Sequence, residues 1–153
     1  MANNLDNFAL EVVGKNWLVS ELLKAGFQTA VPSYDKGIDL IAFRPPNKNE
    51  MLKAVPLQLK VSKNEVFSLN SKYSECRGLL LVYIWHTLGP HTECFALRYN
   101  EAFKIMQERG YTRTASWKVE GEYTTNKPSA ELKKTLKLYK CGPNRWARLF
   151  KTS

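Results

Sequence analysis

An aspartate, a glutamine and a lysine lie in two neighbouring strand-like segments of the sequence. Asp39 stands in the apolar run 38–44, while Gln58 and Lys60 are two residues apart in the apolar run 52–62. Because strand side chains alternate between faces, Gln58 and Lys60 are expected to point to the same side. Carboxylate and amide oxygens are the ligand types that Mg²⁺ takes, so these residues predict a divalent-cation site beside a cationic group.

A helix predicted over residues 5–25 supplies a further acid. Leu18 and Leu22 mark its buried stripe, and Glu11 precedes them by seven and eleven residues. At 100° per residue, Glu11 falls within about 20° of both leucines, which places it on the inward-facing stripe. The alternative is a first-turn glutamate that interacts with the helix dipole and with Lys15.

The remaining apolar patterns predict a mixed β-sheet flanked by helices, an α/β or α+β fold, in one domain over residues 1–153. Segments rich in β-forming residues predict strands at 27–32, 38–44, 52–62, 78–86 and 94–99. Helical patterns follow at 100–110 and at 127–142, the latter starting near Ser129. The segment 62–77 is expected to be a loop with a short helix, and 111–128 has no firm period.

The net charge indicates what kind of partner the protein binds, and the cysteine content indicates the cellular compartment. The net charge is +9, with 23 Lys and Arg against 14 Asp and Glu, which favours a polyanionic partner such as DNA. The three widely spaced cysteines match neither a disulfide framework nor a zinc spacing, so reduced thiols in the cytoplasm are expected. No apolar run approaches the roughly 20 residues that span a bilayer, so no membrane association is expected.

Taken together, these motifs resemble the PD-(D/E)XK nuclease superfamily, a restriction-endonuclease-like group that includes Holliday-junction resolvases. The resemblance covers roughly residues 8–99 and rests on Glu11, on the GIDLIAF strand with Asp39, and on the PLQLKVS strand with Gln58 and Lys60. The chain departs from the family pattern at two points. Gly37-Ile38 precedes Asp39 in place of the family's proline, and Gln58 replaces the second acid.

The resemblance implies a metal-dependent endonuclease that hydrolyses DNA phosphodiester bonds with Mg²⁺ or Mn²⁺. Asp39, Gln58 and the backbone carbonyl of Leu59 would hold the metal, and Glu11 would contribute directly or through water. Lys60 would orient the attacking water and stabilise the charge that develops on the phosphate. The alternative is a catalytically decayed nuclease fold that acts as a nucleic-acid-binding or protein-interaction module, because a lost carboxylate is what decay would produce first.

Basic and polar residues outside this motif are candidates for nucleic-acid contact. The basic C-terminal helix and tail, about 129–153, carry one group, and the connection after Lys60 carries the other. Solvated surface charge is the alternative for both. The candidates are Lys63, Ser68, Asn70, Lys72, Lys133, Lys137, Lys140, Arg145 and Arg148. A homodimer or higher homo-oligomer is also expected, because duplex cleavage often needs two sites.

Overall fold

Six of the seven strands lie between the first helix, α1, and the second, α2, and the other helices follow toward the C-terminal end. The structure is a computed structural model and describes residues 5–151. Its elements are α1 (Asn7–Lys24), β1 (Gln28–Ala30), β2 (Leu40–Phe43), β3 (Ala54–Val61), β4 (Phe67–Asn70), β5 (Leu80–Trp85), β6 (Glu93–Arg98), α2 (Tyr99–Glu108), α3 (Ala115–Glu120), β7 (Glu122–Thr125), α4 (Ala130–Leu136) and α5 (Pro143–Lys151), with a 3₁₀ turn, η1 (Ser71–Glu75), after β4.

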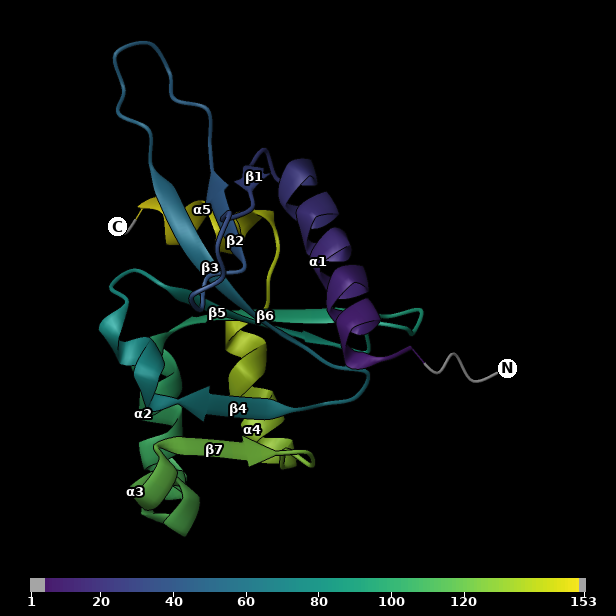
Figure 1. The fold of residues 1–153 in the computed structure, drawn as a ribbon, viewed down its shortest axis with the longest axis vertical. Helices are drawn as coiled ribbons and strands as arrows, with labels where there is room; N and C mark the ends of the chain where they lie inside the picture. Colours follow the sequence, from purple (N-terminus) through teal and green to yellow (C-terminus); the bar gives the residue numbers. More distant parts are fainter. Residues whose placement is uncertain (1–4, 152–153) are drawn as a thin grey trace.

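A five-stranded mixed sheet forms the centre of the molecule, in the order β1-β2-β3-β5-β6 (Figure 1). Strands β1, β2 and β3 pair antiparallel, β3 and β5 pair in parallel, and β5 and β6 pair antiparallel. The predicted mixed sheet flanked by helices is therefore confirmed, and all five predicted strands belong to it. The parallel step from β3 to β5 requires a crossover, and the segment with β4 and η1 provides it.

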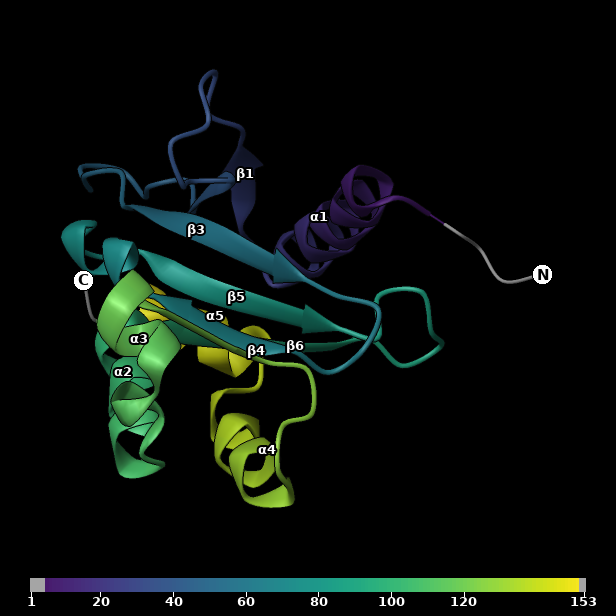
Figure 2. The same ribbon diagram turned by 60° about the horizontal axis from the view of Figure 1, so that its bottom comes forward.

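Both faces of the sheet are covered, and β5 contributes side chains to each. Leu80, Val82 and Ile84 pack on the face that α1 and α5 cover. Leu81, Tyr83 and Trp85 pack on the opposite face, against β4, α2 and α4. Helices α2 and α4 lie below the sheet in Figure 2. The near-continuous apolar sequence of β5 reflects this position, because a strand buried on both faces has no polar side.

Helix α1 lies unusually close to β3. Its N-cap is Asp6, whose carboxylate accepts from the Ala9 N–H at 2.8 Å, and Gly26 at φ +88° follows its end. Gly14 is buried where the helix crosses the strand, and a Cβ placed there would collide with the Val61 side chain. The missing side chain therefore sets the distance between the first half of α1 and β3.

The predicted single C-terminal helix over 127–142 is wrong. Ser129 caps α4 as expected, but α4 ends at Leu136, and a short 3₁₀ turn leads to an extended Lys140 that bridges to Phe95 of β6. Pairing with β6 thus draws the chain out of the helix. Pro143, which suits a first helical position, then begins α5.

A second, two-stranded sheet was not predicted. Strand β4 lies in the segment predicted as a loop with a short helix, and β7 lies in the segment without firm period. They pair antiparallel with Phe67 opposite Thr125. Each strand has four residues, and the pairing joins segments far apart in the sequence, so local pattern carries little signal for either.

No helix within residues 5–151 has the length and apolar character that crossing a membrane requires.

Candidate active site

The candidate site lies where β3 extends beyond its partner β2. The β2 ladder reaches β3 only as far as Leu57, so residues 58–61 of β3 have no strand on that side. Asp39 comes directly before β2, and its backbone N–H donates to the Leu57 carbonyl at 2.8 Å. This bond holds Asp39 at the open edge of β3.

The Asp39 carboxylate is bound to that edge by two hydrogen bonds. Its Oδ2 atom accepts from the backbone N–H of Leu59 at 2.7 Å and from Gln58 Nε2 at 2.8 Å. The strand edge therefore fixes the position and orientation of the acid that the sequence motif singles out.

Asp39 is held in an environment that disfavours its charge. Burial raises the pKa of its carboxyl above the ordinary 3.8, and the nearby Asp35 carboxylate raises it further. The hydrogen bond from the Leu59 N–H and the charges of Lys15 and Lys60 lower the pKa of Asp39, but the pKa stays above its ordinary value. An added positive charge beside Asp39 would relieve both the burial penalty and the repulsion from Asp35.

A cleft of about 400 Å³ opens beside Asp39, between α1 and the edge of β3. Three of the four side chains that the motif singles out, Glu11, Asp39 and Gln58, line it together with Leu59. The complete lining is Phe8, Glu11, Val12, Lys15, Asp35, Asp39, Gln58, Leu59 and Val61. Glu11 reaches the cleft because Gly14, one turn further along, allows α1 to approach β3 closely.

Lys60 does not line this cleft. It follows Gln58 by two residues, and its amine donates to the Tyr73 hydroxyl at 3.0 Å and lies 4.7 Å from the centre of the Tyr73 ring. Tyr73 belongs to the core on the sheet face opposite α1, so Lys60 and Glu11 approach the strand edge from opposite sides. Lys60 is still close enough to lower the pKa of Asp39.

The side-chain amide of Gln58 decides how well the site fits a divalent cation. Its nitrogen donates to Asp39 Oδ2 at 2.8 Å and to the Leu59 carbonyl at 3.4 Å, which are two of the oxygens that the motif assigns to the metal. Its oxygen, Oε1, is buried and has no hydrogen-bond partner in the described part of the chain. Rotation of the amide would present Oε1 beside Asp39 and Leu59, a set of hard oxygen ligands that suits Mg²⁺ or Mn²⁺.

The acidic side chains alone do not make a metal site. Among residues 5–151, no group of three or more His, Cys, Asp or Glu side chains is arranged to hold a metal ion. The donor set therefore fits a cation only if it includes the Gln58 oxygen and the Leu59 carbonyl.

Five residues of the cleft lie outside the motif, and the three charged or aromatic ones among them, Phe8, Lys15 and Asp35, were missed by sequence reasoning. The sequence pattern presents Lys15 only as a helical partner of Glu11, and Asp35 is not among the predicted site residues. Phe8 is 76% exposed although it lines the cleft, which is an unusual position for a large aromatic ring. The spacing of Phe8, Glu11 and Lys15 on one helical face is the signal that could have identified two of them.

None of the nine predicted nucleic-acid-contacting residues lines this cleft, and two have structural roles. Arg145 is largely buried, donates to the Ala96 carbonyl at 2.9 Å and pairs with Glu101 at 3.5 Å. Asn70 caps η1 by accepting from the Lys72 N–H and donates to Glu122 at 3.1 Å. We therefore do not retain Arg145 or Asn70 as phosphate contacts.

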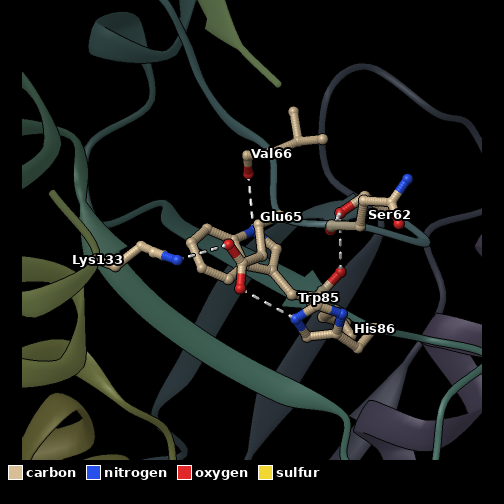
Figure 3. Close-up of polar contacts among 8 residues, drawn as sticks. Ser62, Glu65, Val66, Trp85, His86 and Lys133 are labelled. Atoms are coloured by element: carbon tan, nitrogen blue, oxygen red, sulfur yellow. Dashed lines mark hydrogen bonds and ion pairs between the residues drawn. The ribbon is translucent and has the colours of Figure 1, made fainter. Parts of the chain in front are cut away.

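Lys133 belongs to a small polar cluster with Glu65 and His86, outside the cleft (Figure 3). Its amine pairs with one Glu65 oxygen at 3.2 Å, and the other Glu65 oxygen contacts His86 Nε2 at 3.3 Å. Because α4 ends at Leu136, Lys133 does not share a continuous helical face with Lys137 and Lys140. The basic C-terminal helix that the sequence predicts is therefore divided, with Lys133 in α4 and Lys137 in the 3₁₀ turn that follows.

The other candidates lie at the surface on separate elements. Ser68 is part-buried in β4, and its backbone carbonyl accepts from the Tyr83 hydroxyl at 2.6 Å. The exposed basic candidates are Lys63, Lys72, Lys137, Lys140 and Arg148.

Comparison with known proteins assigns neither a family nor a function to this site. No protein-family model matches the chain, and no curated protein sequence or solved structure matches it. The fold class is a mixed α/β domain with an acid- and amide-lined cleft at the edge of its central sheet, and the functional argument rests on that cleft.

Proposed function

We propose that this protein is a divalent-cation-dependent endonuclease that hydrolyses phosphodiester bonds of DNA. The observation that carries the proposal is the convergence of Glu11, Asp39, Gln58 and the Leu59 backbone on one cleft, with Lys60 next along β3. The net charge of +9 supports a polyanionic substrate. The sequence resemblance to PD-(D/E)XK nucleases is consistent with both points.

Asp39, the Gln58 oxygen and the Leu59 carbonyl would hold the cation, and Glu11 would complete the set directly or through water. A bound Mg²⁺ or Mn²⁺ would polarise the scissile phosphate and lower the pKa of a water molecule. The raised pKa of Asp39 supports this assignment, because a carboxylate destabilised by burial and by Asp35 gains most from an added cation.

Two lysines would act on the substrate from opposite sides of β3. Lys15 lines the cleft and would bind a phosphate of the DNA backbone. Lys60 would leave the Tyr73 hydroxyl to orient the attacking water and to stabilise the charge that develops on the phosphate. Tyr73 would then be a positioning residue for Lys60.

One observation favours a second candidate function. The Gln58 amide nitrogen lies within hydrogen-bond distance of the Asp39 and Leu59 oxygens, so these oxygens are already satisfied without a cation. A nuclease fold that had lost its chemistry would have this arrangement. The second candidate is therefore a non-catalytic nucleic-acid-binding or protein-interaction module.

A cleavage assay separates the two candidates. The whole chain is incubated with plasmid, branched and single-stranded DNA and with RNA, in Mg²⁺, in Mn²⁺ and in a chelator. Cleavage of DNA that needs the cation and is lost in Asp39→Ala and Lys60→Ala would support the endonuclease. Glu120→Gln, an exposed carboxylate outside the cleft, is the matched control and should cleave normally.

Thermal unfolding with and without the cation gives a readout that does not depend on activity. A ligand that binds only the folded state raises Tm, so Mg²⁺ should raise the Tm of the parent and of Glu120→Gln but not of Asp39→Ala. DNA binding with no cleavage and no cation-dependent Tm shift would contradict the endonuclease and support the second candidate.

The proposal extends to assembly, because cutting both strands of a duplex often needs two sites. We propose that the active form is a homodimer or higher homo-oligomer. Sedimentation of the whole chain with and without duplex DNA would test this, and a monomer under both conditions would contradict it.

A further inference from the structure

Cys94 and Cys141 bring two thiols together from segments far apart in the sequence. Cys94 is in β6, and Cys141 lies in the connection between α4 and α5. The Cys94 thiol donates to the Cys141 sulfur, and the two Sγ atoms are 2.8 Å apart. A disulfide bond is only about 0.8 Å shorter than this separation.

The backbone places the two cysteines opposite each other. Phe95 and Lys140 form an antiparallel bridge, and the next pair along it is Cys94 with Cys141. The Cys141 N–H donates to the Cys94 carbonyl at 2.8 Å. Directly opposed residues of an antiparallel pair have Cα atoms about 5.5 Å apart, which lies inside the range that a disulfide spans.

The two thiols differ in their access to reagents. Both line a cleft of about 170 Å³ between the end of α1 and the start of α5, with Trp17 and Trp146 among its walls. Cys141 is partly exposed, whereas Cys94 is buried. Burial raises the pKa of the Cys94 thiol, so it stays protonated, and Cys141 is the sulfur that meets an oxidant first.

We propose that Cys94 and Cys141 are a reversible redox site, in which a peroxide oxidises the pair to a disulfide that joins β6 to the segment leading into α5.

The reaction balances over two steps. The Cys141 sulfur attacks one peroxide oxygen, the O–O bond breaks, and one water leaves, which makes Cys141 a sulfenic acid. The Cys94 sulfur then attacks the Cys141 sulfur, the S–O bond breaks, and the leaving hydroxyl takes up the Cys94 thiol proton and departs as a second water. The two thiols together lose two electrons and two protons, and hydrogen peroxide takes them up as it becomes two waters.

The bond would reinforce the attachment of α5 to the sheet. That attachment already includes the Arg145 hydrogen bond to the Ala96 carbonyl and the packing of Phe150 on Phe27, with ring centres 4.2 Å apart. The cysteines are 47 residues apart in the sequence, so a disulfide closes a long loop and restricts the unfolded chain.

Mild oxidation of the whole chain with hydrogen peroxide tests the proposal. Thiol titration of the denatured protein should fall from three free thiols to one, since the chain has three cysteines. Peptide mapping without reductant should join the Cys94 peptide to the Cys141 peptide with the loss of two hydrogen atoms. The Tm should rise by roughly 10 °C, as expected for closing a loop of this length in a protein of this size.

Two cysteine variants serve as controls, one outside the pair and one within it. Cys76→Ser, which leaves the pair intact, should show the same cross-link and the same Tm rise. Cys141→Ser, at the partly exposed position, should show neither, and dithiothreitol should reverse both effects in the parent. A parent that keeps three thiols, that joins Cys76, or that oxidises Cys141 while Cys94 stays free would overturn the proposal.

Discussion

The side-chain amide of Gln58 donates a 2.8 Å hydrogen bond to the carboxylate of Asp39 at the open edge of β3. The nitrogen of that amide also lies 3.4 Å from the Leu59 carbonyl, while its oxygen is buried without a partner. A neutral N–H group therefore stands next to two oxygens that a cation would share. The chemistry of the cleft therefore depends on whether this amide turns.

Asp39→Asn should change stability and activity in opposite directions. The folded-state pKa of Asp39 lies above the ordinary 3.8, so the folded chain binds more protons than the unfolded chain between these two values. Stability is therefore lost as pH rises through that window, and the loss is complete above the folded-state pKa. The asparagine oxygen can still accept the Leu59 N–H, and we expect the variant to melt above the parent at pH 7 and level with it below pH 3.8.

Cation-dependent cleavage by Asp39→Asn should fall roughly 100-fold or more, because the variant lacks the central carboxylate of the site. Thermal melts across pH and cleavage rates in Mg²⁺ measure the two effects on the same samples. Glu120→Gln, which removes an exposed carboxylate elsewhere, should change neither. A variant that melts below the parent at pH 7 would contradict the burial penalty assigned to Asp39.

Gln58→Glu should make the site more dependent on a cation. The new carboxylate would join Asp39 and Asp35, so like-charge repulsion should lower Tm in a chelator. In Mg²⁺ the added charge should tighten cation binding by roughly tenfold, about 1.4 kcal/mol. Titration calorimetry and melts with and without Mg²⁺ measure this. Gln28→Glu, the same change at an exposed position of β1, is the control, and equal cation affinity in both variants would exclude Gln58 as a ligand.

Phe8→Ala should weaken binding of single-stranded DNA without lowering Tm. The ring lines the cleft but is 76% exposed, so it adds little to the core and offers a surface for a stacked base. Loss of one stacked base costs about 1 kcal/mol or more, so affinity should fall roughly fivefold or more. Fluorescence anisotropy in a chelator measures binding apart from cleavage. Leu23→Ala, also exposed on α1 but outside the cleft, should bind as the parent does.

Glu65→Gln should remove a pH-dependent contribution to stability. Burial alone would raise the pKa of Glu65, but hydrogen bonds from Lys133 and His86 outweigh it and lower the pKa below 4.5. Such a group stabilises the fold above pH 4.5, and the contribution disappears as pH falls through the folded-state pKa. At pH 7 the variant should melt roughly 2 °C below the parent, since a part-exposed pair contributes at most about 1 kcal/mol.

The difference between Glu65→Gln and the parent should vanish in acid, and differential scanning calorimetry over a pH series would show whether it does. Glu108→Gln is a suitable control, because its pair with Lys104 is exposed and 3.9 Å long. A constant difference at every pH would mean that packing, and not the charge of Glu65, stabilises this cluster.

The local sequence pattern was sufficient to predict the strands of the central sheet and the relation between two of the candidate residues on β3. The apolar runs predict the five strands of the main sheet, because each run has the period and composition of a half-buried or buried strand. The two-residue spacing also predicts that Gln58 and Lys60 share a face of β3, because that relation depends on a single strand.

Only the tertiary structure decided which residues form the cleft and how the C-terminal part folds. Lys15 and Asp35 join Asp39 because α1 approaches β3 at Gly14 and the chain before β2 turns back on itself. Strands β4 and β7, the break after α4 and the contact between Cys94 and Cys141 all arise from pairing across long stretches of chain. The sequence pattern of a segment indicates which secondary structure that segment prefers. Contacts between distant segments depend on which segments the fold places side by side.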